Sequence, residues 1–165
     1  MDKALVCLLL LLTGCAAAPP DTLRGLSGTL APCPGAPRCV SSRAEDPEKR
    51  VPPLRFAGSP AQQRRALAAV VQSMDGGEVI TAKGDYVHAT FTSDWFGFVD
   101  DVEFVLTGSE IIHVRSSSRI GYYDFGVNRA RVEEIRDRLR QHTNSQAARE
   151  AVCLSCASGA RANSR

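Results

Sequence analysis

The spacing of the hydrophobic residues changes from helical to strand-like and back along this chain, and this order sets the class of fold. Between residues 67 and 74 apolar side chains recur three or four positions apart, which is the spacing of one helix face. From residue 78 they alternate with polar residues, which is typical of strands with one buried face. A second helical pattern covers residues 127–141. This order predicts an α+β domain.

The sheet is expected to be mainly antiparallel, with about four strands and both helices packed on one face. Short turns separate the periodic runs, which favours hairpins between consecutive strands. The first helix should begin at Ser59, because Pro60 follows at the first helical position and Gln62 completes a capping box. The predicted strands cover residues 78–83, 86–93, 98–106 and 110–116.

The Thr-Gly-Ser turn between the third and fourth predicted strands suggests their register. A three-residue loop would gather the apolar side chains on one face and pair Asp101 with Arg115 and Glu103 with His113 on the other. A two-residue loop would mix polar and apolar residues on each face. The preferred register leaves Asp100 on the apolar face, where its carboxylate is costly unless it is paired.

The first residues resemble the leader of a bacterial lipoprotein. The apolar run at residues 4–12 is too short to span a bilayer and has the length of a signal sequence. Leu-Thr-Gly-Cys15 after it resembles a lipobox, which implies that Cys15 carries lipid and begins the mature chain; Ala16 after it resembles lipoproteins sorted to the outer membrane. An ordinary signal cut after residues 16–18 is the alternative.

These features divide the chain into four segments. Residues 1–14 are expected to be a signal peptide and residues 15–32, rich in Ala, Pro and Gly, a flexible tether. Residues 33–141 form a single α+β domain. Residues 142–165 are expected to be a disordered tail, apart from a short helix around residues 147–156.

The cysteines indicate disulfides and no metal site, and the net charge bears on nucleic-acid binding. In an oxidising periplasm each close pair, Cys33 with Cys39 and Cys153 with Cys156, is expected to form a disulfide. A Cys-based metal site needs four ligands, and only three His are scattered through the chain, so no metal and no cofactor is predicted. The net charge of +2 is too balanced to favour nucleic acid.

Most of the ionisable residues with specific chemistry lie between residues 93 and 131. Three acidic residues within four positions could hold Ca²⁺ or Mg²⁺, but alternation along the strand divides them between two faces. A sheet face of ion pairs plus one paired, buried Asp is the preferred interpretation. The residues concerned are His88, Asp100, Asp101, Glu103, His113, Arg115, Arg119 and Asp124.

The polar segment before the second helix could form an anion pocket. Hydroxyls, guanidinium groups and the free N–H groups of a helix N-terminus all favour negative charge, such as a phosphate or a lipid head group. Alternatively, Arg119 and Arg129 pair with Asp100 and Asp124 and hold the loop. The pocket would use Ser116, Ser117, Ser118, Arg119, Asn128 and Arg129.

Two further interpretations concern the same region. One of the serines at 116–118 could act with His88 or His113 and an Asp in a hydrolytic triad, although no Gly-x-Ser-x-Gly elbow is present. The aromatic residues of the nearby loops could line a small apolar pocket or cap the end of the core. They are Trp95, Phe96, Tyr122, Tyr123 and Phe125.

Four motifs in order resemble the uncharacterised family called domain of unknown function 1499. They are CP…CVSS at residues 33–42, DYVHA at 85–89, GFVDDVEF at 97–104 and VRSSSRIGYYDFGVNR at 114–129. The resemblance covers residues 33–141 and implies a bacterial envelope or secreted domain, without a catalytic assignment. Tyr123 and Phe125 stand where smaller or polar residues are expected, and the Cys153 and Cys156 tail lies outside the family region.

The expected function is therefore that of a non-enzymatic lipoprotein at the outer membrane, facing the periplasm. It would be attached to the membrane through Cys15 and would bind an envelope component, anionic in the first interpretation. A hydrolase that uses Ser, His and Asp around the Arg-rich loop is the alternative. A scaffold that contacts another envelope protein is a third.

Overall fold

The structure is a computed structural model, and it describes residue 23 and residues 29–162. The predicted signal peptide, Cys15 and most of the predicted tether lie outside the described residues. The same holds for the side chains of Cys153 and Cys156.

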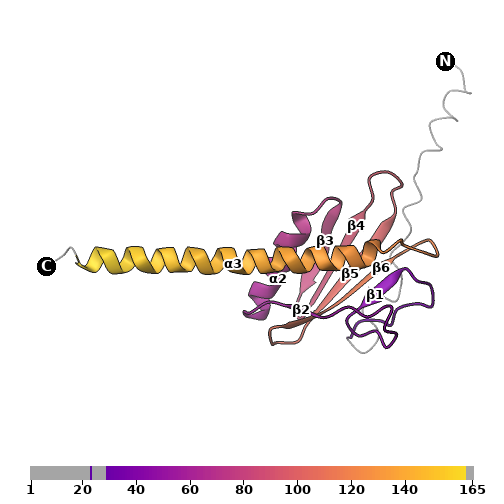
Figure 1. The fold of residues 1–165 in the computed structure, drawn as a ribbon, viewed down its shortest axis with the longest axis horizontal. Helices are drawn as coiled ribbons and strands as arrows, with labels where there is room; N and C mark the ends of the chain where they lie inside the picture. Colours follow the sequence, from indigo (N-terminus) through magenta and orange to yellow (C-terminus); the bar gives the residue numbers. More distant parts are fainter. Residues whose placement is uncertain (1–22, 24–28, 163–165) are drawn as a thin grey trace, which may run out of the picture.

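The α+β prediction is confirmed: residues 29–162 form one antiparallel sheet with two helices (Figure 1). The sheet order is β1-β6-β5-β4-β3, and β2 also pairs with β6. The sheet has six strands instead of about four, because β1 and β2 are only three and two residues long and show no periodicity. The elements are β1 (Cys39–Ser41), β2 (Leu54–Arg55), α2 (Pro60–Gln72), β3 (Gly77–Lys83), β4 (Tyr86–Thr92), β5 (Val99–Leu106), β6 (Ile111–Ser118) and α3 (Val127–Ala162).

Both helices pack on the same face of the sheet and enclose one hydrophobic core. Alternate apolar residues of β4, β5 and β6 meet the inward stripes of α2 and α3 in a single buried cluster. The first helix begins as predicted: Ser59 Oγ accepts from Gln62 N, and Gln62 Oε1 accepts from Ser59 N at 2.8 Å. The fully buried members include Leu67, Val87, Val102, Phe104, Ile112, Val114, Val132 and Ile135.

The register between β5 and β6 differs from the prediction by two residues. Leu106 pairs with Ile112 and Glu103 with Arg115, so the predicted pairs Asp101–Arg115 and Glu103–His113 are wrong. The turn is longer because its own side chains satisfy the backbone: Thr107 Oγ1 donates to Ile111 O at 2.8 Å, and Ser109 Oγ accepts from Ile111 N. A shift of two residues keeps every side chain on its predicted face.

Helix α3 is longer than predicted. It begins at Val127 as expected, but it continues to Ala162 instead of ending at Gln141, where the tail was expected to lose regular structure. No Gly or Pro interrupts residues 127–158, so the chain offers no local stop signal. Figure 1 shows the second half of α3 extending well beyond the sheet.

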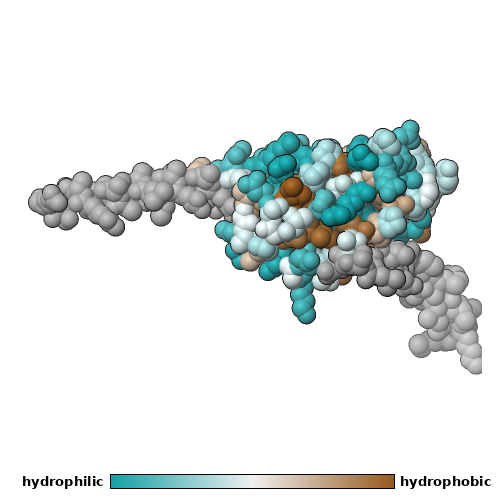
Figure 2. All heavy atoms as spheres, turned by 90° about the horizontal axis from the view of Figure 1, so that it is seen from below, coloured by the Kyte–Doolittle hydropathy of each residue, from teal (hydrophilic) through white to brown (hydrophobic). Residues whose placement is uncertain are grey.

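The N-terminal side of the domain is held by the predicted disulfide, which joins Cys33 to Cys39. Within residues 29–162 the structure contains no helix that is both long enough and apolar enough to cross a membrane. Figure 2 shows, on the face seen from below, a mostly hydrophilic surface with hydrophobic residues gathered in a band across the middle of the domain.

Candidate functional site

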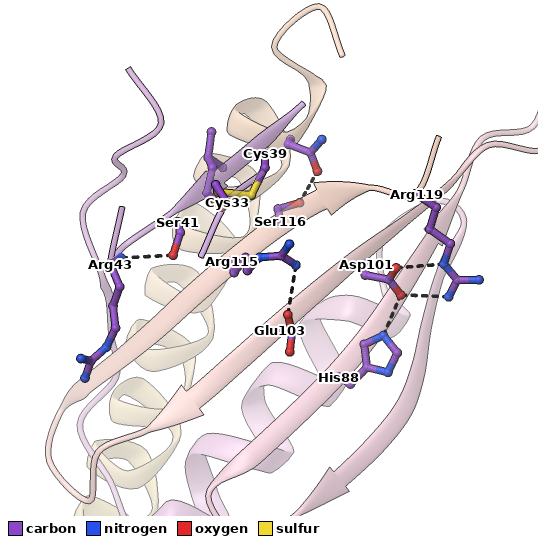
Figure 3. A network of polar contacts seen from close by, with 12 residues as sticks. Cys33, Cys39, Ser41, Arg43, His88, Asp101, Glu103, Arg115, Ser116 and Arg119 are labelled. Atoms are coloured by element: carbon purple, nitrogen blue, oxygen red, sulfur yellow. Dashed lines mark hydrogen bonds and ion pairs between the residues drawn. A yellow bond between two sulfur atoms is a disulfide. The ribbon is translucent and has the colours of Figure 1, made fainter. Parts of the chain in front are cut away.

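The acidic residues of β5 divide between the two faces of the sheet, as alternation predicted. Asp101 and Glu103 lie on the face opposite the helices, and Figure 3 shows Asp101 between His88 and Arg119. His88 Nε2 lies 2.8 Å from Asp101 Oδ1. Arg119 makes two bonds to the same carboxylate, from Nε to Oδ2 and from Nη2 to Oδ1, each 2.9 Å. Asp101 is 1% exposed, so this is a buried, bidentate ion pair.

A second buried pair lies beside it on the same face. Arg115 Nη1 lies 3.1 Å from Glu103 Oε2, and the Tyr86 hydroxyl donates to Glu103 Oε1 at 2.8 Å. The predicted face of cross-strand ion pairs is therefore present, but with Glu103 in place of Asp101 as the partner of Arg115.

The protonation of Asp101 follows from these contacts. Burial alone raises the pKa of its carboxyl group, but the hydrogen bonds from His88 and Arg119 outweigh burial and hold the pKa below its ordinary value. The hydrogen bonds that Arg119 donates to Asp101 in turn raise the pKa of Arg119. The Arg119 guanidinium is thus committed to Asp101, which disfavours the predicted anion pocket at this residue.

His113 meets a serine, but not one of those predicted. Its Nδ1 lies 3.1 Å from Ser42 Oγ, which also accepts from Val114 N at 3.0 Å. Burial, with a smaller contribution from the nearby Arg43 charge, lowers the pKa of His113. Ser116 instead donates to Asn128 Oδ1 at 2.6 Å on the helix face of the sheet. His113 and Ser116 therefore have partners other than those of the triad hypothesis.

The buried carboxylate on the helix face is paired by an arginine that the sequence analysis missed. Arg131 Nη2 lies 2.7 Å from Asp100 Oδ2, and its guanidinium also lies 4.8 Å above the centre of the Phe91 ring. Neither Arg119 nor Arg129 reaches Asp100: Arg119 binds Asp101, and Arg129 Nη1 donates to a main-chain oxygen. Helical spacing could have identified Arg131, which lies one turn after Asn128 on the side facing the sheet.

The N-terminus of α3 is occupied by a carboxylate from its own loop. Asp124 Oδ2 accepts from Asn128 N at 3.1 Å and from Asn128 Nδ2 at 2.8 Å, and Asp124 Oδ1 accepts from Gly126 N at 3.0 Å. These are the N–H groups that an external anion would use. Asp124 therefore caps the helix. It does not form the ion pair with Arg119 or Arg129 that the sequence suggested.

A groove of about 710 Å³ opens beside the Asp100–Arg131 pair. It lies between the β4–β5 loop, the β6–α3 loop and the first turns of α3. Its walls are mostly apolar and aromatic, and Asp100 and Arg131 contribute to its lining. The apolar lining residues are Met74, Phe91, Phe96, Phe98, Ile120, Tyr123, Phe125, Val127 and Ala130.

The aromatic residues of the two loops are unusually exposed. Trp95 is 92% exposed and Phe125 87%, and Phe96 and Tyr122 are more than three-quarters exposed. The rings pair within each loop, Phe96 with Phe98 and Tyr123 with Phe125. The aromatic cluster predicted from the sequence therefore lines and surrounds a groove and does not cap the core.

The predicted site residues thus lie in four places. Asp101, Glu103, Arg115 and Arg119 form the buried face opposite the helices, while His113 lies with Ser42. Asp100, Ser116, Asp124 and Asn128 surround the start of α3, and Arg129 binds the main chain of the segment before β2. Within the described part of the chain, no three His, Cys, Asp or Glu side chains form a group that could hold a metal ion.

The chain matches a model of a protein family. No curated protein and no solved structure is significantly similar to the chain. A family model described as a protein of unknown function (DUF1499) matches residues 29–139, which is more than half of the chain. This match covers every element from β1 to the packed part of α3, and the chain therefore belongs to the DUF1499 family.

Proposed function

We propose that this protein is a non-enzymatic binding module of the bacterial cell envelope, and that the groove beside α3 takes an apolar ligand. The lipobox-like sequence at Cys15 supports attachment to the outer membrane, with the domain facing the periplasm. The Cys33–Cys39 disulfide supports an oxidising compartment.

The observation that carries the proposal is the exposure of the aromatic residues around a concave surface. Scattered exposed apolar residues are ordinary, but a contiguous patch usually marks a binding site. Here Phe96 and Phe125 line the groove, and the exposed Trp95 and Tyr122 project from the same two loops. Removing such rings from water stabilises a complex by roughly 25 cal/mol per Å² of apolar surface.

The polar contacts favour binding over catalysis. Both histidines of the triad hypothesis lie on the opposite face of the sheet, away from the groove, His88 with Asp101 and His113 with Ser42. Among the described residues that line the groove there is no His, Cys or Lys to act as a base or nucleophile. These contacts also favour an apolar ligand over the anionic one first considered, because Arg119 and the helix N-terminus already have carboxylate partners.

The test is binding of N-phenyl-1-naphthylamine, a neutral probe whose emission rises in apolar surroundings. The full chain would carry Cys15→Ser, which prevents attachment of lipid, and would have its disulfide formed. Trp95, the single Trp of the chain, stands between Asp94 and Phe96, which line the groove, so we expect its fluorescence to report binding. We expect saturable binding.

Substitutions at two equally exposed residues show where the probe binds. Phe98 in the groove and Ile80 on β3 are each 50% exposed, so Phe98→Ser and Ile80→Ser remove similar apolar surface. We expect Phe98→Ser to weaken binding at least fivefold and Ile80→Ser to leave it unchanged. Equal affinity of the two variants, or no saturable binding to the parent chain, would overturn the proposal.

A further inference from the structure

We propose that the ligand of the groove is a segment of polypeptide that carries basic side chains next to apolar ones. This inference rests on the proposed function, since it names the partner of the same groove. Three observations support it: the charge of the lining, the aromatic rims, and the concave form of the site.

The first observation is the charge. The lining contains five acidic and two basic side chains, a formal net charge of −3. Arg131 pairs with Asp100, and Arg138 pairs with Glu134 at 2.7 Å, so both arginines are already matched by carboxylates. The remaining acidic side chains are Asp75, Asp94 and Asp124. An apolar groove with this surplus attracts cations and repels anions.

The second observation is the arrangement of the aromatic rings. A guanidinium already lies over a ring at this site, that of Arg131 over Phe91. The exposed faces of Phe96, Tyr123 and Phe125 offer further positions of the same kind to an incoming Lys or Arg. Aromatic residues and Met are also the residues most enriched at protein–protein contacts, and Met74 contributes to the wall.

The third observation separates a peptide from a membrane surface. Exposed Trp, Tyr and Phe on loops also suit a lipid interface, but bacterial membranes carry anionic head groups that attract basic surfaces. Asp94 and Asp124 lie within the two aromatic loops and would oppose that contact. The groove is concave and partly lined by α3, which suits an inserted side chain better than a flat bilayer.

The experiment compares three short synthetic peptides with the full chain carrying Cys15→Ser. One alternates Leu with Lys, one Leu with Glu, and one Ser with Lys. Binding would be followed by Trp95 fluorescence and by displacement of N-phenyl-1-naphthylamine. We expect only the Leu–Lys peptide to bind tightly and displace the probe, and its affinity to fall as salt is added.

A charge variant and a matched control test whether the acidic side chains of the groove lining attract the peptide. Asp75→Asn with Asp94→Asn removes two exposed charges from the groove, and Glu78→Gln with Glu110→Gln removes two exposed charges elsewhere. At about 0.2–1 kcal/mol for each exposed ion pair, the first double variant should bind the Leu–Lys peptide about fivefold more weakly. The second should bind it as the parent chain does.

The outcomes distinguish this inference from the proposed function. If the groove binds the neutral probe but the Leu–Glu peptide competes as well as the Leu–Lys peptide, the inference fails and the apolar groove stands. If neither probe nor peptide binds, both fail. Vesicles of phosphatidylethanolamine and phosphatidylglycerol provide the remaining comparison. If the protein binds these vesicles but not the Leu–Lys peptide, its partner is a lipid surface and the inference is overturned.

Discussion

Asp100 of β5 and Arg131 of α3 form an ion pair that joins the sheet to the long helix. The Oδ2 and Nη2 atoms lie 2.7 Å apart, and the two side chains are only 11% and 12% exposed. Asn128 and Ser116 supply acceptors to the same guanidinium at 3.1 and 3.3 Å. The pair forms part of the groove lining, so it links the stability of the fold to the shape of the candidate site.

Replacing Arg131 alone should be strongly destabilising. Arg131→Met leaves the Asp100 carboxylate buried without its partner, and losing one member of a buried pair costs about 3 kcal/mol or more. Arg131→Met with Asp100→Leu removes both charges and should recover most of that loss. Urea unfolding of the three proteins measures the difference.

The exposed pair Arg140–Asp137 is the control for this prediction. Its side chains are 67% and 63% exposed, and removing Arg140 should change the free energy of unfolding by less than about 1 kcal/mol. If Arg131→Met lowers the free energy of unfolding no more than Arg140→Ala does, burial of the Asp100 carboxylate does not depend on its pair with Arg131.

The pairing of Asp101 predicts a specific acid dependence. Its folded pKa is below the ordinary value of 3.8, so the unfolded chain binds a proton more readily than the folded one. The stabilising contribution is therefore complete above pH 3.8 and is lost as the pH falls through the folded pKa. Asp101→Asn should be less stable than wild type at neutral pH, and the difference should narrow below pH 3.8.

Urea unfolding over a series of pH values measures this convergence. Asp137→Asn serves as a matched control, because Asp137 is 63% exposed and its pair with Arg140 lies on the surface. A stability difference between wild type and Asp101→Asn that stays constant down to the acid transition would contradict the assignment of the lowered pKa to the His88 and Arg119 contacts.

The faces of the sheet could be predicted from the sequence, but the register could not. The alternation of apolar and polar residues fixes which face each side chain occupies, and it is unchanged when a strand shifts by two residues. The choice between such registers depends on the turn, where Thr107 and Ser109 bond to the main chain. Face alternation places Arg119 on the same face as Asp101, but only the observed register, in which Ser117 lies opposite Asp101, brings the two side chains together.

The candidate groove was only partly predictable for a related reason. The sequence marks the aromatic residues of both loops, but these loops have no periodicity that would place them next to each other. They meet because β4 ends, β5 begins and β6 ends at the same end of the sheet, and this follows from the strand order. Arg131 reaches the groove from α3 and Met74 from the turn after α2, and the sequence did not specify how these segments pack.

His113 predicts a second pH dependence, at milder acidity. Its folded pKa lies below the ordinary value of 6.5, chiefly because the imidazole is partly buried. The stability that this group contributes is therefore complete above pH 6.5 and is lost as the pH falls from there through the folded pKa. In His113→Asn the free energy of unfolding should depend less on pH in that window, and an unchanged slope would contradict the prediction.

The Cys33–Cys39 disulfide should stabilise the edge of the sheet by a modest amount. The bond joins residues six positions apart and ties the start of the domain to β1, where Cys39 pairs with Ser117 of β6. For so short a loop the chain-entropy estimate is about 2 kcal/mol. Cys33→Ser with Cys39→Ser should lower the free energy of unfolding by about that amount, as measured in urea.

A reductant provides the matched control, because it removes the same bond without a substitution. Reduction should destabilise the wild-type chain as much as the double substitution does, and it should leave the double variant unchanged. Lys49 Nζ also holds the bridged loop through the carbonyls of Pro34 and Gly35, at 2.7 and 2.9 Å. If reduction left the wild-type free energy of unfolding intact, Lys49 and the β1–β6 pairing would suffice to hold this segment, and the disulfide would not be needed for its stability.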